Sequence, residues 1–483
     1  MEEPRPPSRR WFLLVPILGV LCGLAALILV LSLQLVTGGA LGLLAGHVPP
    51  DGGAPAVPAE RPWLLPLLAG GGALLASLLT ARYVPGVGGA DSAIGSAHRE
   101  PALIGARVPP VKTAATALTL GSGGSGGTEG PISQIGAALG SGLARRYRLT
   151  EDQARTLVFT GMGAGIAAIF KSPLGGAVIA AELPTRRGLT PRLLLPAVIA
   201  TALAYTVFAA VKGWQPAFGA RTAELELAVW PAAVAVGVAC GVTGRFYLRG
   251  LESAVAVTAW LRVRGVPGWA SACAGGLAVG ALALAVPGVL GTGYGTAHLA
   301  LDREATMTAA LWMLAVFPLA KLVATALTVG TGGSGGVFGP GLVIGASLGC
   351  LLWRLALPYG LATPTPVPFV VMGMAAGIGP LVHAPIGVTL LAAEVTWSWN
   401  LLAPTGLAVL CATLIVRDRT LYPSQPKHRV GGSRCAQHSR PTSTPLSSIS
   451  RASPSRIWTR WTAGLWPSAC AECLATTTAG RTS

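Results

Sequence analysis

One acidic residue stands in an unusually bare piece of backbone. Residues 121–131 read GSGGSGGTEGP, in which six positions are glycine and Glu129 is the only charged group. Glycine leaves backbone N–H groups sterically open. A proline in the first turn of a helix is well tolerated, because its missing N–H would have no partner there. We therefore expect Pro131 to open a helix whose free N–H groups lie around Glu129.

The same arrangement returns 209 residues later. The stretch VKTAATALTLGSGGSGGTEGPISQIGAALG from Val111 aligns with AKLVATALTVGTGGSGGVFGPGLVIGASLG from Ala320. The segments that follow, from Gly161 and Gly373, also match, at an offset of 212 residues. Such regular spacing makes chance similarity a poor explanation. Two related halves are typical of membrane transporters and channels, whose ion site lies at the repeat interface where helices are broken.

Two such helix starts facing each other would form an anion site without a full positive charge. A helix N-terminus carries about half a positive charge, and residues 127–129 and 336–338 would supply its N–H groups. A buried Lys or Arg would hold an ion too tightly for conduction. The Glu129 carboxylate is itself an anion at this place. We predict that it fills the site when ionised and leaves it when protonated or outcompeted, which makes it a gate and leaves proton carriage open.

Other interpretations of the glycine stretch were weighed against this one. A solvent-facing Glu129 that merely stabilises a helix N-terminus is the plainest alternative. A phosphate-binding loop needs a lysine in G-x-x-x-x-G-K-[ST], and that lysine is absent. A membrane-embedded enzyme would need a nucleophile with its base or a metal cluster, and no H-E-x-x-H or paired His and Cys occurs in the repeats. We expect no catalytic residue, metal or cofactor.

The composition places these segments in a membrane. The 483 residues are 52% hydrophobic and only 11% charged, whereas soluble proteins carry about a quarter charged residues. Residues 11–33 contain no charge, and a helix of that length, about 35 Å, crosses a bilayer core of about 30 Å. A secretory signal peptide is the other interpretation, but its apolar run is usually about 7 to 15 residues and ends at an A-x-A-like site, which this run lacks.

Further apolar stretches follow along the chain. They lie at 62–81, 193–211, 226–244, 269–290 and 306–330, and no Asp, Glu, Lys or Arg occurs between Arg354 and Glu394. The abundant Gly and Ala suit close helix packing in lipid. The expected fold class is therefore all-α, in a polytopic membrane protein.

Positive charge gathers at the chain ends. Three arginines lie in residues 1–10, Arg417 and Arg419 follow the last apolar stretch, and residues 427–483 carry +7 of the net +17. The positive-inside tendency predicts a cell-membrane protein with both termini in the cytoplasm. No nucleic-acid-binding motif is visible, so we expect no such partner. Residues 426–483 are rich in Ser, Pro, Thr and Arg, which predicts a disordered basic tail able to contact anionic lipid.

The paired motifs resemble those of the CLC family of chloride channels and proton-coupled chloride transporters. GTEGP at 127–131 resembles G-(K/R)-E-G-P, and GVFGPGLVIGASLG at 336–349 resembles G-x-F-x-P-x-x-x-x-G-x-x-x-G. GVLGTGYG at 288–295 and PPVK at 109–112 are also similar. TLYPSQ resembles the stretch with the family's pore tyrosine, which would be Tyr422. The resemblance covers about residues 12–425.

The resemblance implies an inverted-repeat helical fold with broken helices over residues 11–425, with halves of about 62–211 and 226–425. It implies a homodimer with one pore per subunit and chloride as the transported anion. Glu129 would gate a passive channel, with proton-coupled exchange as the alternative. The anion would contact the Tyr422 hydroxyl and the backbone of Gly127, Thr128, Gly130, Val337, Phe338 and Gly339. On sequence alone, Tyr422 could equally be an anchor at the membrane interface.

Two positions depart from the family pattern. The first anion motif, G-S-G-x-P, corresponds here to PGVGGADSAI at 85–94, where Gly88 stands in place of the serine. Ser92 or Ser96 would substitute only in a shifted register, so the site would rely on backbone N–H groups and fluoride or nitrate stay open as substrates. The inner proton glutamate of many exchangers corresponds to Leu183, which slightly favours a channel.

Three pairs of polar residues recur at matching positions of the two repeats. They are Glu182 and Glu394, Lys112 and Lys321, and Lys171 and His383. Because both repeats keep a polar group at each place, we interpret the two glutamates, Lys171 and His383 as residues at helix ends, and the other two lysines as structural. A proton path through the two glutamates is the alternative.

Overall fold

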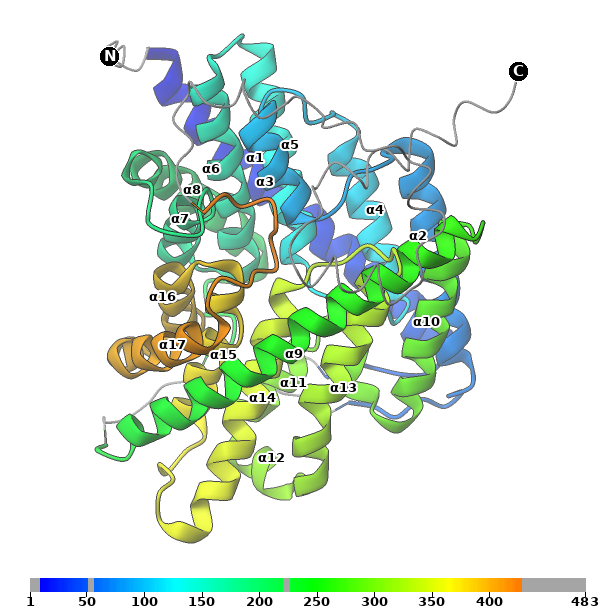
Figure 1. The fold of residues 1–483 in the computed structure, drawn as a ribbon, viewed down its shortest axis with the longest axis vertical. Coiled ribbons are helices and arrows are strands. Elements are labelled where there is room, and N and C mark those ends of the chain that lie inside the picture. Colours follow the sequence, from blue (N-terminus) through cyan, green and yellow to red (C-terminus); the bar gives the residue numbers. More distant parts are fainter. Residues whose placement is uncertain (1–8, 51–55, 220–225, 428–483) are drawn as a thin grey trace, which may run out of the picture. The chain divides into compact units, whose positions relative to one another are not determined.

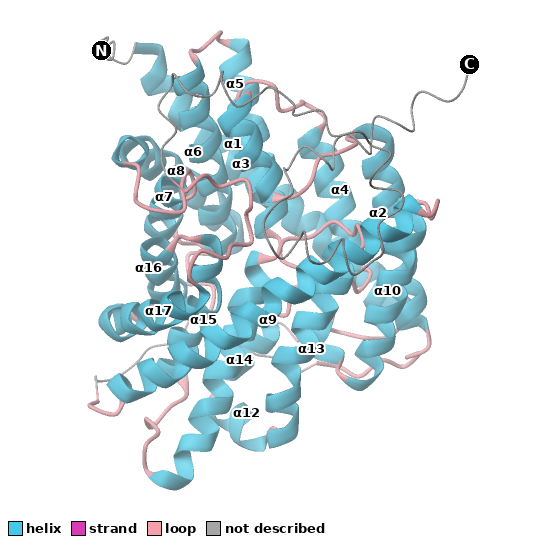
Figure 2. Ribbon diagram, viewed as in Figure 1, coloured by secondary structure: helices cyan, strands magenta, loops and turns pink. Residues whose placement is uncertain are grey.

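The computed structural model describes residues 9–50, 56–219 and 226–427, and these are almost entirely helical (Figure 2). Within them, extended backbone is limited to isolated bridges. The expected all-α fold class is confirmed. Of the basic tail predicted at 426–483, residues 428–483 lie outside the described part of the chain.

The described residues of the first half of the chain form eight α-helices, which Figure 1 labels. They are α1 (Arg9–Thr37), α2 (Leu64–Tyr83), α3 (Ala90–Arg99), α4 (Val108–Gly121), α5 (Glu129–Arg146), α6 (Glu151–Phe170), α7 (Pro173–Glu182) and α8 (Leu194–Lys212). A π-helix at Gly38–Leu44 continues α1.

Between residues 226 and 427, nine further α-helices follow. They are α9 (Val229–Val263), α10 (Gly268–Ala285), α11 (Tyr294–Leu301), α12 (Arg303–Thr308), α13 (Leu311–Gly330), α14 (Phe338–Ala356), α15 (Val367–Val382), α16 (Pro385–Thr396) and α17 (Leu402–Val416).

The two halves pack by the same scheme. Helix α1 contacts α4, α6 and α8, and α9 contacts the matching helices α13, α15 and α17. Helices α2 and α10 pack on each other across the halves, as do α7 and α16. Because α1 takes the place in its half that α9 takes in the other, we place α1 in the first repeat, ahead of the range 62–211 expected from sequence.

Eight helical stretches of the described residues are long and apolar enough to cross a membrane. They are Leu13–Leu44, Leu64–Tyr83, Pro191–Lys212, Val229–Val263, Gly268–Ala285, Leu311–Gly330, Phe338–Tyr359 and Trp399–Val416. Three shorter apolar helices, α7, α15 and α16, lie between them. The expectation of a polytopic membrane protein is confirmed.

Glycine sets the distance between the helices that follow the two glycine stretches. A Cβ at Gly136 on α5 would overlap the carbonyl oxygen of Gly161 on α6, and a Cβ at Gly161 would overlap that of Gly136. The equivalent residues of the second repeat, Gly345 on α14 and Gly373 on α15, face each other in the same way. The sequence repeat is thus also a repeat of helix contacts. These contacts hold α5 against α6 and α14 against α15.

We predict that Gly136→Ala lowers stability, because the added methyl group forces α5 and α6 apart, at a cost of about 1–3 kcal/mol. Gly142→Ala on the same helix is the matched control. Nothing lies within 4 Å of a Cβ at Gly142, and alanine favours the helix. Thermal unfolding followed by size-exclusion chromatography should give a lower midpoint for Gly136→Ala only. Equal midpoints for the two variants would contradict this account of the contact.

Candidate functional site

The two glycine stretches meet through their backbones. The N–H of Gly127 donates to the carbonyl of Gly336, and the N–H of Gly336 donates to the carbonyl of Gly127, both at 2.7 Å. A Cβ at Gly130 would lie 2.7 Å from the Cα of Gly336, so only glycine permits this approach. We expected the Gly127 N–H to contact an anion. While this pair is intact, that N–H is hydrogen-bonded to the Gly336 carbonyl and cannot donate to an anion.

Each stretch is also held by a helix of the other repeat. The N–H of Ser125 donates to Thr328 Oγ1 on α13 at 2.9 Å, and the N–H of Ser334 donates to Thr119 Oγ1 on α4 at 3.1 Å. The four positions match in the repeat alignment. Each of the helices α4 and α13 therefore accepts a hydrogen bond from the glycine stretch of the other half.

The serine hydroxyls pair with two further threonines. Ser125 Oγ lies 3.2 Å from Thr325 Oγ1, and Ser334 Oγ lies 3.0 Å from Thr116 Oγ1. Residues 123–127 match the pattern G-x-S-x-G literally, but the partner of Ser125 is a threonine and not a histidine base. This arrangement supplies hydrogen bonds to a loop and no activated nucleophile.

Both expected helix starts are confirmed. Helix α5 begins at Glu129 and α14 at Phe338, so Pro131 and Pro340 stand third in their first turns. The first amides of a helix have no intrahelical acceptor, and proline has no N–H. The donors at each start are therefore the amides that precede the proline, which belong to Glu129 and Gly130 in α5 and to Phe338 and Gly339 in α14.

Glu129 connects the two helix starts. Its carboxylate Oε2 accepts a hydrogen bond from the N–H of Gly339 at 3.0 Å, and Oε1 lies 3.3 Å from Thr128 Oγ1. The residue is 1% exposed, so the solvent-facing alternative is wrong. An acid of the first repeat thus binds the positive end of a helix of the second repeat. A small anion could accept the same hydrogen bond only if the carboxylate moved away.

Two tyrosines that the sequence analysis did not assign lie beside this contact. The Tyr247 hydroxyl on α9 donates to the carbonyl of Val337 at 2.9 Å. The Tyr294 hydroxyl is buried without a hydrogen-bond partner among the described residues, and a Cβ at Gly339 would touch both it and the Glu129 carboxylate. Tyr294 belongs to the GVLGTGYG motif, so the sequence contained a pattern from which it could have been assigned to the site. Tyr247 stands in an apolar helix without a motif.

Lys321 holds the GVLGTGYG motif at 288–295 in place. Its Nζ donates to the carbonyls of Val289 at 3.0 Å and Gly291 at 2.8 Å. Gly291 in turn pairs with the first glycine stretch, since its N–H donates to Gly124 and its carbonyl accepts from the N–H of Gly126. The buried ammonium group therefore holds a loop in place, in keeping with the structural interpretation. Its repeat counterpart, Lys112, instead lines the cavity described next.

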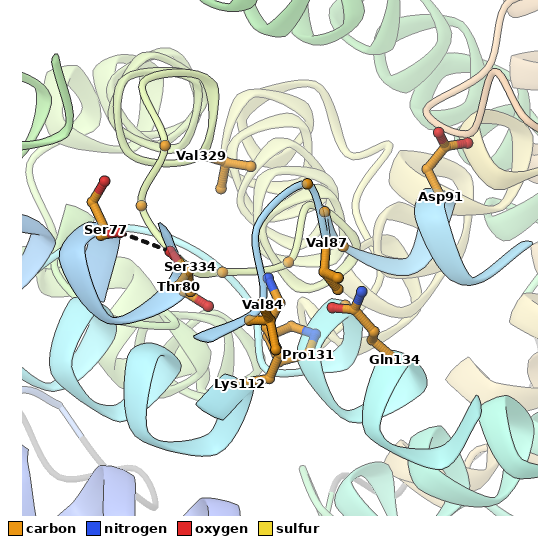
Figure 3. Close-up of a pocket in the computed structure, with 18 of the residues that line it drawn as sticks. Ser77, Thr80, Val84, Val87, Asp91, Lys112, Pro131, Gln134, Val329 and Ser334 are labelled. Atoms are coloured by element: carbon orange, nitrogen blue, oxygen red, sulfur yellow. Dashed lines mark hydrogen bonds between the residues drawn. The ribbon is translucent and has the colours of Figure 1, made fainter. Parts of the chain in front are cut away.

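A cavity of about 610 Å³ lies next to the helix starts (Figure 3). Its wall includes four of the expected anion-binding residues, namely Gly88, Gly130, Val337 and Tyr422. The structure therefore brings the four together from distant parts of the chain. The other five expected site residues, Gly127, Thr128, Glu129, Phe338 and Gly339, are not among the lining residues but are their chain neighbours.

Tyr422 is buried in this wall, and hydrogen bonds hold the residues that follow it in the chain. It is 5% exposed, so the alternative of an interfacial anchor is wrong. The Asp91 carboxylate accepts from the N–H of Ser424 at 2.8 Å and from its hydroxyl at 2.9 Å. Arg186 donates to the carbonyls of Pro423 at 3.1 Å and Gln425 at 2.9 Å. Neither Asp91 nor Arg186 was assigned from the sequence, since their contacts join residues more than 230 positions apart.

The structure leaves no hydroxyl in place of the missing serine. Gly88 lines the cavity in the unshifted register, whereas Ser92 and Ser96 are absent from its lining. Ser92 Oγ donates to the carbonyl of Gly89 at 2.9 Å and accepts from Gln134 Nε2 at 2.9 Å. Neither Ser92 nor Ser96 therefore takes the place of the motif's serine in the cavity wall.

The paired glutamates cap helices reciprocally. Glu182 at the end of α7 accepts from the N–H of Gly387 at 2.7 Å, at the start of α16. Glu394 on α16 accepts from the N–H of Gly175 at 2.8 Å and from the Ser172 hydroxyl, at the start of α7. These contacts agree with the structural interpretation of both acids.

Lys171 and His383 end two equivalent helices. They are the C-caps of α6 and α15, in left-handed conformations with φ of 55° and 53°. Their expected place at helix ends is confirmed.

Comparison with known proteins supplies the family. The family model for voltage gated chloride channels matches residues 72–417. Chloride channel protein CLC-f of Arabidopsis thaliana is 30% identical over 319 residues, which are 62% of this chain but only 41% of that protein. The putative chloride channel protein ClcB-like of Ralstonia nicotianae is 31% identical over 374 residues, which are 74% of this chain and 84% of that one.

Solved structures share the fold. A slow cyanobacterial Cl⁻/H⁺ antiporter has a TM-score of 0.72 at 22% identity, over 85% of this chain and 95% of its own. A CLC-type fluoride/proton antiporter has a TM-score of 0.72 at 23% identity, over 88% of this chain and 100% of its own. On the family match, the duplicated glycine stretches and the shared fold, this chain belongs to the voltage gated chloride channel (CLC) family.

Proposed function

We propose that this protein moves chloride, or a related small anion, across a cell membrane along a pathway gated by Glu129. The observation that carries the proposal is the hydrogen bond from the Gly339 N–H to the Glu129 carboxylate. A fixed carboxylate and a mobile anion compete for one donor at the positive end of α14. The pathway is closed while the carboxylate is bound and opens when protonation or a competing anion releases it.

The surroundings suit an ion that must also leave. The donors at the two helix starts are backbone amides, which attract an anion through partial charges. The adjoining cavity contributes the Tyr422 hydroxyl and, at Gly88, bare backbone. Binding by such groups is weak enough to permit release, which conduction requires. We assign anion contacts to Thr128, Gly130, Val337, Phe338, Gly339, Tyr422 and Gly88, and to Gly127 only when its pairing with Gly336 opens.

We favour an uncoupled channel over exchange. Leu183 is a buried apolar residue where an inner proton acceptor would stand, and the neighbouring Glu182 carboxylate is engaged by amides of α16. Proton-coupled exchange of chloride, fluoride or nitrate is the second candidate. It is favoured by the likeness of the fold to the Cl⁻/H⁺ and fluoride/proton antiporters.

The same proposal extends to the assembly. We place both termini in the cytoplasm because arginines flank the first and last apolar stretches. We further propose a homodimer with one pathway per subunit, and contact of the basic tail with anionic lipid. No enzymatic role is proposed, since the hydroxyls of Ser125 and Ser334 pair with threonine hydroxyls and not with a histidine base.

Glu129→Gln tests the gate. The neutral amide cannot compete with an anion as a carboxylate does, so the variant should conduct at every pH, and any proton coupling should be lost. Wild-type flux should rise as the pH falls, because protonation neutralises the carboxylate. Chloride flux from liposomes at several pH values measures both. Glu252→Gln, at an exposed position of α9, is the matched control. Unchanged flux and pH dependence in Glu129→Gln would remove Glu129 from this role.

A chloride gradient across liposomes decides between the two modes. A channel dissipates the gradient without moving protons, whereas an exchanger uses it to drive protons uphill. We expect no uphill proton movement when wild-type protein is reconstituted and internal pH is followed with a dye. Sustained uphill movement would overturn the channel and support the exchanger.

Tyr422→Phe tests the cavity. Loss of the hydroxyl removes one hydrogen-bond donor, and a hydrogen bond to a charged group contributes about 1.5–3 kcal/mol. Chloride should therefore bind roughly tenfold more weakly in isothermal titration calorimetry. Tyr359→Phe is the control, because Tyr359 is 79% exposed. Equal chloride affinity in wild type and Tyr422→Phe would exclude this hydroxyl from the binding site.

A further inference from the structure

Gln134 is a buried polar side chain on the cavity wall (Figure 3). It stands on α5, five residues beyond Glu129, and is 1% exposed. Its Nε2 donates to Ser92 Oγ at 2.9 Å, whereas its Oε1 has no hydrogen-bond partner among the described residues. A buried amide oxygen without a partner is costly, so the arrangement calls for an explanation.

The cavity beside this amide has room for an ion. Gly88 and Gly89 carry no side chain, and a Cβ at Gly88 would have only Ser92 atoms within 4 Å, the nearest at 3.5 Å. Asp91 is the single carboxylate among the lining residues, and both of its oxygens accept hydrogen bonds from Ser424. The lining also includes the cations Lys112 and Arg262. The lining thus presents an anion with no carboxylate that is free of hydrogen bonds.

The carboxamide can reverse its ends without leaving a group unpaired. Its oxygen and nitrogen ends are similar in size, and the terminal torsion of glutamine has a broad, roughly two-fold profile. After a half-turn, Oε1 would face Ser92, whose hydroxyl could donate to it. The Gly89 carbonyl would lose that hydroxyl but keep the Ser92 N–H, which donates to it at 3.1 Å. Nε2 would then point its N–H groups into the cavity.

We propose that Gln134 is an anion-binding residue of this cavity, whose carboxamide turns so that Nε2 donates to the ion while Ser92 holds Oε1. The inference rests on the proposed function, since it takes the cavity as part of the anion pathway. It adds a side-chain donor where Gly88 provides none. Because the donor is a neutral amide, Gln134 itself adds no full charge to the site.

Chloride titration of the purified full-length protein by isothermal titration calorimetry tests this assignment. Gln134→Met has a similar size but no N–H donor, and should bind chloride about tenfold more weakly. Ser92→Ala should bind chloride more tightly than wild type, because Nε2 then has no acceptor to give up when it turns. Gln34→Met, at an exposed position of α1, is the matched control and should bind as wild type does.

The opposite signs separate a binding role from a structural one. If Gln134 only joined α5 to α3 through Ser92, the two variants would be impaired alike, and an equal loss in both would overturn the proposal. Unchanged affinity in Gln134→Met would also overturn it. Should that variant elute as aggregate, Gln134→Asn, which keeps the amide but withdraws it from the cavity, must show the same loss. Wild-type protein that neither binds nor transports chloride would instead refute the proposed function.

Discussion

The reciprocal backbone pairing of Gly127 and Gly336 is the contact on which the rest of the site depends. It places the start of α5 against the start of α14, although their sequences lie 209 residues apart. Two helix ends of like polarity repel, and neither is exposed to water. The pairing is stable because Ser125 and Ser334 are each held by a threonine of the opposite half, and because the Glu129 carboxylate neutralises part of the positive potential.

Several scaffold contacts recur in both repeats, whereas Glu129, which we propose as the gate, has no acidic counterpart in the second repeat. Contacts that hold the frame occur twice, as in the crossed capping by Glu182 and Glu394. At the centre the repeat alignment sets Glu129 against Phe338, so one helix start sends out a carboxylate and the other an aromatic ring. The Phe338 ring lies 5.9 Å from that of Phe170. Duplication thus supplies two donors of equal kind, and one substitution between the copies supplies a group that competes for them.

Two of the full charges near the proposed anion site are engaged by backbone carbonyls. The Lys321 ammonium group donates hydrogen bonds to two backbone carbonyls. Arg186 donates to two carbonyls of the segment that carries Tyr422. What remains at the helix starts is amide N–H groups and hydroxyls. In the proposed function, groups of this kind bind an anion weakly enough for it to leave.

The amino-acid sequence was enough to predict the helical membrane fold, the repeat and the two helix starts, and it singled out Glu129 as the candidate gate. Each of these features is encoded locally, in apolar runs, in glycine and proline at fixed spacing, or in a motif. The three-dimensional structure was needed to show that the Glu129 carboxylate accepts a hydrogen bond from Gly339, that Tyr247 and Tyr294 lie beside it, and that Gln134 lines the cavity. Such contacts depend on how each helix is rotated about its axis and how closely it packs, and no spacing within one segment encodes the position of a partner in another.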